Sequence, residues 1–399
     1  MMKALPEAPP QRSAPDRYVT LDGMRGLAAI AVALFHFDIY LMPHGYVAVD
    51  LFFVLSGFVL YRSYLPRFRA GMGVGRFMVQ RFARLYPLFL LGLMLGCALA
   101  LQQMLVADPK APNGSDLAVT MLFNGLMLPS PASLPLYPLN VPSWSLFFEV
   151  VANLALVVLI FRLPRAALVA ICVVAAVGMI PIVLANGSGN IGALWHEHSI
   201  ALMRTAFSFT LGVIIAMLPE WRAVLPVSTR GHLRNVPASL PDTQDVASWR
   251  SPPGGELVTT SQRASSWIGV ACIAAVGVLL ALPVSGEWTA RYDLAIILFF
   301  SPLLVYVGSR VEPVAFAVPL AGFSGEVSYA LYAVHWSFIE PMRAAVRHFG
   351  LSPIPAAALF LALMLAAAWA AVRWYDLPLR RRLTALLRVP TRGASALGA

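Results

Sequence analysis

The chain has 399 residues, of which 59% are hydrophobic and only 12% are charged. Soluble domains carry about 25% charged residues, so this composition excludes a soluble globular protein, a disordered chain and a disulfide-stabilised secreted scaffold. The net charge of +10 comes from arginines in loops and at helix ends, which favours membrane orientation over nucleic-acid binding. The sequence therefore predicts an integral membrane protein whose partner is the lipid bilayer and not a nucleic acid.

Ten apolar segments are predicted to cross the bilayer as helices. They lie at 21–42, 46–65, 85–107, 144–161, 166–184, 200–218, 266–283, 293–308, 327–347 and 354–374. An eleventh segment, 117–129, is shorter and ends in Pro-Ser-Pro, which favours a re-entrant or interfacial helix. The predicted fold is an all-α, polytopic membrane helix bundle of about ten transmembrane helices plus this short element.

The distribution of arginines predicts the orientation of the bundle. If 117–129 does not cross, the arginine-rich loop after the second span, the loop 220–265 and the C-terminal tail all lie on one side. We therefore expect both termini to be cytoplasmic. Arg343 and Arg347 fit this arrangement poorly, because they come out on the external side.

The chain divides into a membrane domain and two tails. We expect an N-terminal tail at 1–17, a membrane domain at 18–378 and a basic tail at 379–399. The loop 220–265 is rich in Pro, Ser, Gly and Arg and is expected to be flexible. The first 20 residues contain no apolar signal-peptide region. Together with the spans, this favours a bacterial inner membrane.

Ionisable side chains inside apolar segments are costly in lipid and are therefore functional candidates. Arg25 and His36 are eleven residues apart in the first span, so they share one face about 16 Å apart along the axis. Asp22 is placed to pair with Arg25. Asp50 opens the second span and is expected to orient the His36 imidazole as a catalytic base. The alternatives are an interface anchor for Arg25, a packing role for His36 and an N-cap for Asp50.

Two further pairs lie at helical spacing. Arg81 and Arg84 share a face and are able to grip phosphate groups, although anchoring at the cytoplasmic surface is the simpler interpretation of these arginines alone. Ser145 and Glu149 lie one turn apart in an apolar segment, where a glutamate needs a partner.

A third set of polar residues lies within the predicted span 327–347. Ser328, Tyr332 and His335 line one face of the predicted helix. A packing role for His335 remains an equal alternative to substrate contact. Two histidines flank Glu197 in a predicted external loop, where a solvated loop is favoured over metal binding, so no metal site is predicted.

Arginines at the cytoplasmic end of the bundle and a base nearer the outer face predict that the two substrates enter from opposite sides of the membrane. A phosphate-bearing donor, of which acyl-CoA is the best example, enters from the cytoplasm. An acceptor hydroxyl approaches from the other side, and the base removes its proton so that the oxygen attacks the donor.

The sequence motifs also carry a resemblance to a known family. The run 21–36, in which ten residues separate an arginine from a histidine, resembles the opening motif of the acyltransferase-3 family of integral-membrane acyltransferases. Four further family motifs follow in order, at 50–58, 81–87, 144–149 and 328–335. Ala48 replaces a frequent glycine and Asp376 replaces a late glutamate. The resemblance extends over residues 18 to about 378, in the stand-alone form without a fused esterase-like domain.

The resemblance implies transfer of an acyl group, usually acetyl from acetyl-CoA, to a hydroxyl of a carbohydrate or glycolipid. It implies His36 as general base, with acyl-CoA as substrate and no permanently bound cofactor. The expected substrate-binding residues are Arg25, Arg81, Arg84, Tyr86, Trp144, Ser145, Glu149, Tyr332 and His335. The alternative functions are a membrane transporter and a non-catalytic partner in polysaccharide export.

Overall fold

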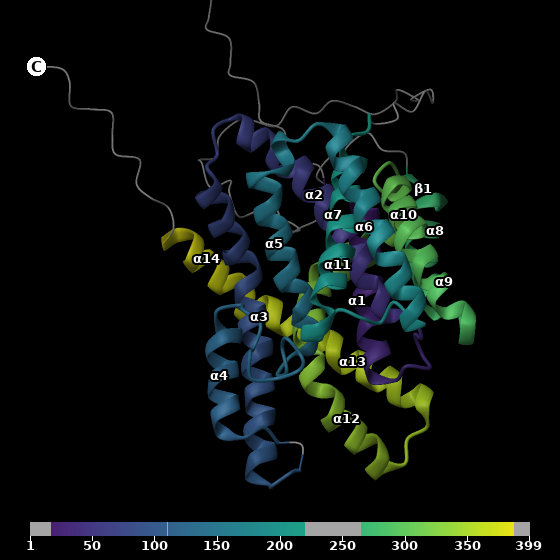
Figure 1. Cartoon of the computed structure of the whole chain (residues 1–399). Helices are drawn as coiled ribbons and strands as arrows, with labels where there is room; N and C mark the ends of the chain where they lie inside the picture. Colours follow the sequence, from purple (N-terminus) through teal and green to yellow (C-terminus); the bar gives the residue numbers. More distant parts are fainter. Residues whose placement is uncertain (1–16, 110, 220–264, 387–399) are drawn as a thin grey trace, which may run out of the picture.

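The computed structural model describes residues 17–109, 111–219 and 265–386, which are almost entirely helical (Figure 1). The expected flexible loop lies outside the described residues, apart from its last position. The same holds for most of both expected tails. The helices are α1 (Val19–Phe37), α2 (Ala48–Arg69), α3 (Val74–Leu105), α4 (Gly114–Gly125), α5 (Trp144–Val158), α6 (Arg165–Asn186), α7 (His198–Met217), α8 (Trp267–Ala281), α9 (Thr289–Ala295), α10 (Ser301–Gly308), α11 (Val318–Val334), α12 (Trp336–Phe349), α13 (Pro353–Ala370) and α14 (Leu377–Leu386). Two short strands, β1 (Ser265–Ser266) and β2 (Glu312–Pro313), pair in parallel.

Eight helical segments of the described chain are long and apolar enough to cross a membrane. They correspond to eight of the ten predicted spans, so the all-α, polytopic membrane fold is confirmed. The other two spans differ from expectation. The segment 266–283 is α8, with only 15 residues, and the segment 327–347 is interrupted at His335, where α11 ends and α12 begins.

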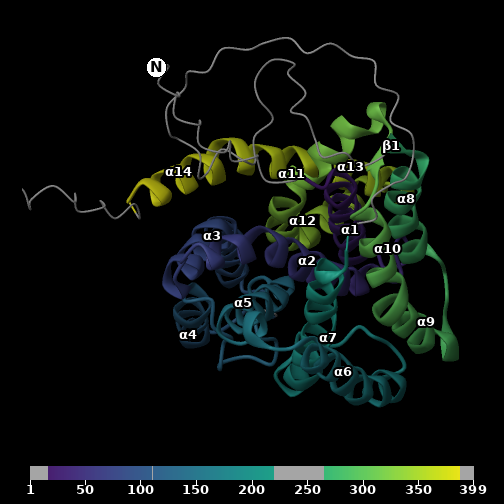
Figure 2. The same cartoon turned by 90° about the horizontal axis from the view of Figure 1, so that it is seen from above.

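Helix α1 lies inside the bundle, where α2, α8, α11 and α13 contact it (Figure 2). Glycine and alanine occupy many of its buried positions, and small residues let neighbouring helix backbones approach closely. The ionisable residues of α1 therefore lie within protein and not against lipid.

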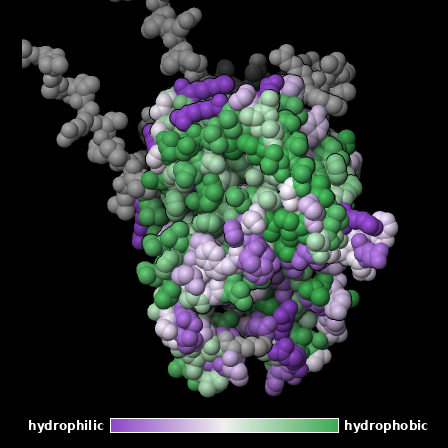
Figure 3. Space-filling model, viewed as in Figure 1, coloured by the Kyte–Doolittle hydropathy of each residue, from purple (hydrophilic) through white to green (hydrophobic). Residues whose placement is uncertain are grey.

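One end of the bundle carries a separate group of helices. α3 has 32 residues and is about 48 Å long, against about 30 Å for the hydrocarbon core of a bilayer. Its second half lies beside α4, which has 12 residues and is too short to span. α4 is the short element expected at 117–129. We call the second half of α3, α4, the loop 126–140 and α12 the polar lobe; in Figure 3 hydrophilic side chains gather there, below an apolar band.

Candidate active site

Helices α1 and α11 pack closely because glycines lie at their contact. A Cβ atom at Gly325 would come within 2.6 Å of the Asp22 Cβ, and one at Gly26 within 2.4 Å of the Ser324 Cβ. This close approach lets Arg25 reach α11, where its Nε donates to the Ser328 hydroxyl over 3.2 Å. The predicted polar faces of these two helices therefore meet.

Arg25 also makes the predicted ion pair within its own helix. Its Nη2 lies 2.7 Å from Oδ1 of Asp22 and donates to the Gly325 carbonyl over 3.2 Å. Arg17 holds the other oxygen of Asp22 at 2.9 Å. Asp22 thus fixes two guanidinium groups at this end of α1.

His36 pairs with His335 at the other end of the same two helices. Nδ1 of His36 lies 2.9 Å from Nε2 of His335, and the two rings are stacked with 5.2 Å between centroids. Nδ1 of His335 lies 2.9 Å from the carbonyl oxygen of Tyr332 and 3.1 Å from that of Leu331. The structure thus brings together two histidines that are 299 positions apart in the sequence.

When both histidines are neutral, their hydrogen-bond partners assign the tautomer of each ring. Carbonyl oxygens only accept, so Nδ1 of His335 carries the proton and its Nε2 is an acceptor. Nδ1 of His36 must then donate to that Nε2. The basic lone pair of His36 is therefore on Nε2, the nitrogen that faces away from His335.

The expected contact between Asp50 and His36 is wrong. Asp50 is fully buried, and its Oδ2 lies 2.5 Å from Nη2 of Arg204 in α7. Ser208 donates to the other carboxylate oxygen over 3.5 Å. A buried carboxylate needs a cationic partner, and Arg204 on the facing helix supplies it. Among the described residues, His335 takes the place that we assigned to Asp50.

Arg81 and Glu149 form an ion pair in the interior. Nη2 of Arg81 and the hydroxyl of Ser56 both lie 2.9 Å from Oε1 of Glu149. Nε of Arg81 is buried and has no hydrogen-bond partner among the described residues. The glutamate thus has the partner that its apolar surroundings require, whereas the arginine retains an unused donor.

Three further arginines lie near this pair. The charges of Arg25, Arg81 and Arg380 all act on the half-buried Arg84. Arg380 in α14 also forms an ion pair with Asp376. We call Arg25, Arg81, Arg84 and Arg380 the arginine cluster. Three of these arginines pair with Asp22, Glu149 and Asp376, so the guanidinium groups outnumber these carboxylates, and this excess favours an anionic ligand.

Ser145 and Tyr332 connect the regions of the arginine cluster and the histidine pair. Their hydroxyl oxygens are 2.7 Å apart, and both groups also reach the Pro142 carbonyl. Tyr332 lies one helical turn from Ser328 and nearly one turn from His335. Polar groups therefore continue along α11 from Arg25 to His36.

Tyr86 and Trp144 have other contacts. The Tyr86 hydroxyl donates to the Gly125 carbonyl over 2.8 Å, which ties α3 to α4. The Trp144 ring packs under the guanidinium group of Arg204, 5.7 Å from its centroid. These contacts are structural, and the expectation that both residues bind substrate stays a prediction.

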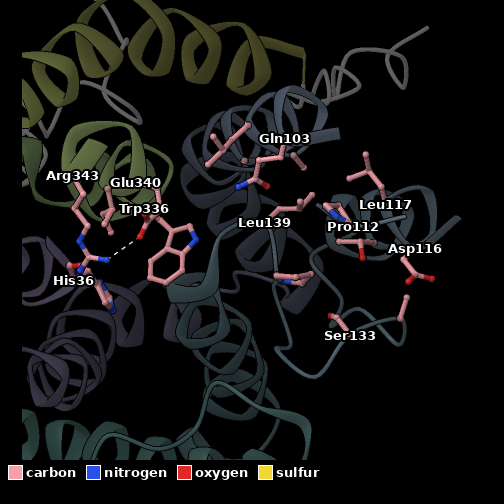
Figure 4. A pocket seen from close by; sticks show the side chains of 17 residues that line it. His36, Gln103, Pro112, Asp116, Leu117, Ser133, Leu139, Trp336, Glu340 and Arg343 are labelled. Carbon is pink, nitrogen blue, oxygen red and sulfur yellow. Dashed lines mark hydrogen bonds and ion pairs between the residues drawn. The ribbon is translucent and has the colours of Figure 1, made fainter. Parts of the chain in front are cut away.

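A cavity of about 340 Å³ opens beside His36 in the polar lobe (Figure 4). Trp336 lies edge-to-face against the His36 ring, with 5.2 Å between centroids. Arg343 donates to the carbonyl oxygens of His36 and Phe37 over 2.8 and 2.9 Å, at the C-terminal end of α1. Sites for small ligands commonly have volumes of about 300–1,000 Å³, so the cavity is large enough for one.

The sequence analysis missed three residues of this region. Arg204 is an arginine within a predicted span, a signal that was present and not used. Arg343 was noted only as an exception to the charge rule, and its contacts with α1 now explain its position. No pattern identified Trp336, because aromatic residues are common throughout membrane helices.

Comparison with known proteins gives one family match and several partial relatives. Residues 18–373 match the acyltransferase domain of the acyltransferase-3 family. Over 156 residues the chain is 37% identical to protein 2 in the picA locus of Rhizobium radiobacter, covering 36% of this chain and 82% of that protein. No solved structure matches the chain.

Two other relatives have informative names. Peptidoglycan O-acetyltransferase OatA of Listeria monocytogenes is 36% identical over 74 residues, which cover 18% of this chain and 12% of that protein. Acyltransferase MdmB of Streptomyces mycarofaciens is 32% identical over 150 residues, or 33% of this chain and 36% of that protein. The chain thus spans only a minor part of these two relatives. Because the family match covers nearly all of the helical core, this chain belongs to the acyltransferase-3 family and is an integral-membrane acyltransferase.

Proposed function

We propose that this protein moves an acyl group, acetyl from acetyl-CoA, to a hydroxyl of a carbohydrate or glycolipid, with Nε2 of His36 as the general base. The observation that carries the proposal is the pairing of His36 with His335 beside a cavity. This pairing leaves a basic nitrogen where an acceptor hydroxyl is able to bind. The name of the OatA relative, a peptidoglycan O-acetyltransferase, supports a glycan acceptor.

The reaction step follows from this arrangement. Nε2 of His36 takes the proton of the acceptor hydroxyl as its oxygen attacks the thioester carbonyl carbon. The C–S bond breaks as the new ester C–O bond forms, and the CoA thiolate leaves. The imidazolium then returns the proton to the thiolate, so that CoA thiol and the O-acyl product result. His335 holds the His36 ring in the tautomer that this step needs.

The arginine cluster is the proposed site for the phosphates of the donor. Guanidinium groups bind phosphate oxygens in a two-pronged geometry, and the unused Nε of Arg81 is available for such a contact. Arg25 and His36 are separated by about 16 Å along α1. The thin arm that carries the thioester therefore has to pass along α1 and α11, where Ser145 and Tyr332 lie.

The arginine excess assigns the sides of the membrane in this proposal. Loops near the arginine cluster face the cytoplasm by the positive-inside rule, and the polar lobe faces outward. Both termini are then cytoplasmic, in a bacterial inner membrane. The donor enters from the side where acyl-CoA is made, and the acceptor binds at the outer cavity.

The test is release of CoA thiol by the purified protein in nanodiscs, with and without a cell-surface glycan fraction. Glycan-stimulated release should be lost in His36→Ala. His348→Ala, at an exposed histidine of α12, is the matched control and should behave as the wild type. Absence of release from a folded wild type with acetyl-, succinyl- and longer acyl-CoAs would overturn the proposal and favour transport.

A further inference from the structure

The cavity of the polar lobe has two walls of different chemistry. His36, Trp336 and Arg343 form one wall, from α1 and α12. Gln103 of α3 lies across from them, and Asp116 of α4 lies at the far end of the lining (Figure 4). Figure 3 shows a hollow among hydrophilic side chains in this part of the surface. A ligand between the walls would meet an aromatic ring on one side and an amide group on the other.

The second wall is held in place by buried polar contacts. The Tyr137 hydroxyl donates to the Met127 carbonyl over 2.6 Å, and Asn124 donates to the carbonyls of Leu128 and Leu136. Ala107 and Met127, with φ of 53° and 57°, are the two non-glycine residues with left-handed backbone in the described part of the chain. Both end helices of this lobe. Strained backbone of this kind persists where surrounding contacts fix it, and it is enriched at ligand sites.

We propose that this cavity binds the acceptor as a neutral sugar ring, with Trp336 as the stacking platform and Gln103 as a hydrogen-bonding group on the opposite wall. A pyranose has apolar C–H faces that pack on an indole and hydroxyls around its rim that donate and accept hydrogen bonds. The opposite wall also has apolar residues such as Leu99, Leu117 and Leu139, but a lipid chain would leave the Gln103 amide without a hydrogen-bond partner from the ligand. Stacking on Trp336 places a ring hydroxyl beside His36, because the two aromatic rings are in contact.

The charges of the lining favour a neutral ring over an acidic one. Arg343 is the lining cation, and it is engaged by Glu340 at 2.9 Å and by two carbonyls of α1. Glu340 and Asp116 are both lining carboxylates. An acidic sugar would therefore meet two carboxylates without gaining an unengaged cation.

The inference rests on the proposed function for the reaction, but binding is measurable without the donor. Calorimetric titration of the nanodisc protein would use methyl glycosides of glucose, galactose and rhamnose and N-acetylglucosamine oligosaccharides, with glucuronic acid as the acidic probe. At least one neutral probe should bind, and glucuronic acid should not. Trp336→Ala should weaken neutral-sugar binding by at least about tenfold, and Gln103→Ala by a smaller factor. Trp288→Ala, at an exposed tryptophan outside the cavity, is the matched control.

The same variants separate failure of the inference from failure of the proposed function. Sugar binding that is lost in Trp336→Ala, without thiol release by the wild type, would support the sugar site and reject acyl transfer. Glycan-stimulated thiol release with an unchanged acceptor KM in both Trp336→Ala and Gln103→Ala would overturn the sugar site. If Trp336→Ala does not fold, the sugar binding and the acceptor KM of Gln103→Ala decide whether the sugar site is supported or overturned. Absence of binding by all neutral probes would also overturn the inference.

Discussion

Asp50 and Arg204 form a fully buried ion pair between α2 and α7, although 154 positions separate them in the sequence. Arg204 also donates to the carbonyls of Gly189 and Ile191. It therefore ties a helix pair to the loop that precedes α7. We expect the pair to stabilise the bundle and to take no part in the reaction itself.

Removal of one partner of this pair should cost stability. Arg204→Ala leaves Asp50 as an uncompensated buried charge, so the free energy of unfolding should fall by about 3–5 kcal/mol. The double variant Asp50→Asn, Arg204→Met should recover part of that loss, because no charge is then stranded. Thermal unfolding in nanodiscs measures both. Unchanged melting of Arg204→Ala with loss of thiol release would instead give the arginine a role in the reaction.

Substitution of His335 should lower kcat much more than it changes the KM for the donor. His335→Leu removes the acceptor for Nδ1–H of His36, so the tautomer with basic Nε2 is no longer favoured. We expect kcat to fall by up to the 10²–10⁴-fold that general-base catalysis typically contributes, with little change in the donor KM. His335→Gln retains a side-chain acceptor and should restore part of the rate. A purely structural role predicts equal damage by both substitutions, and pH–rate profiles of the two variants complete the comparison.

Substitution of arginines in the arginine cluster should weaken binding of the acyl donor. Arg84→Ala should raise the KM for acetyl-CoA by roughly tenfold to a hundredfold, since a hydrogen bond to a charged group contributes about 1.5–3 kcal/mol. Arg84→Lys should be intermediate, because it keeps the charge but not the two-pronged geometry. Arg347→Ala, at an exposed arginine of α12, serves as control. An acetyl-CoA KM that is equal in Arg84→Ala and wild type would remove Arg84 from the donor site.

Close packing of α1 on α11 should be sensitive to one methyl group. At Gly325 a Cβ atom would lie 2.6 Å from the Asp22 Cβ, so Gly325→Ala must move the helices apart. Overpacking of this kind costs about 1–3 kcal/mol, and the Arg25–Ser328 contact should weaken with it. Gly75→Ala in α3 meets open space and should be neutral or slightly stabilising. The melting temperatures of the two alanine variants, measured side by side, test this difference.

The sequence predicted features that depend on spacing along one helix. Arg25 and Asp22 were expected to pair, and they do. Ser328, Tyr332 and His335 were expected to share a face, and all three point to partners in the interior. Helical periodicity fixes which side chains lie together on one helix, so these relationships follow from local geometry.

Partners on different helices could not be predicted in the same way. Periodicity does not say which helix lies opposite, so Asp50 was matched to His36 when its partner is Arg204. The interruption at His335 was also missed, and proline does not account for it, because α12 continues through Pro341.

Arg343 places a guanidinium group at the C-terminal end of α1. The aligned peptide dipoles of a helix place partial negative charge at that end, near the carbonyls of His36 and Phe37. In the proposed reaction, a thioester carbonyl under attack beside His36 would gain negative charge, and the helix end alone would repel it. The guanidinium group supplies a field of the opposite sign at the same place. An arginine that contradicts the loop charge rule is thereby accounted for by its contacts with the end of α1 and not by the orientation of the bundle.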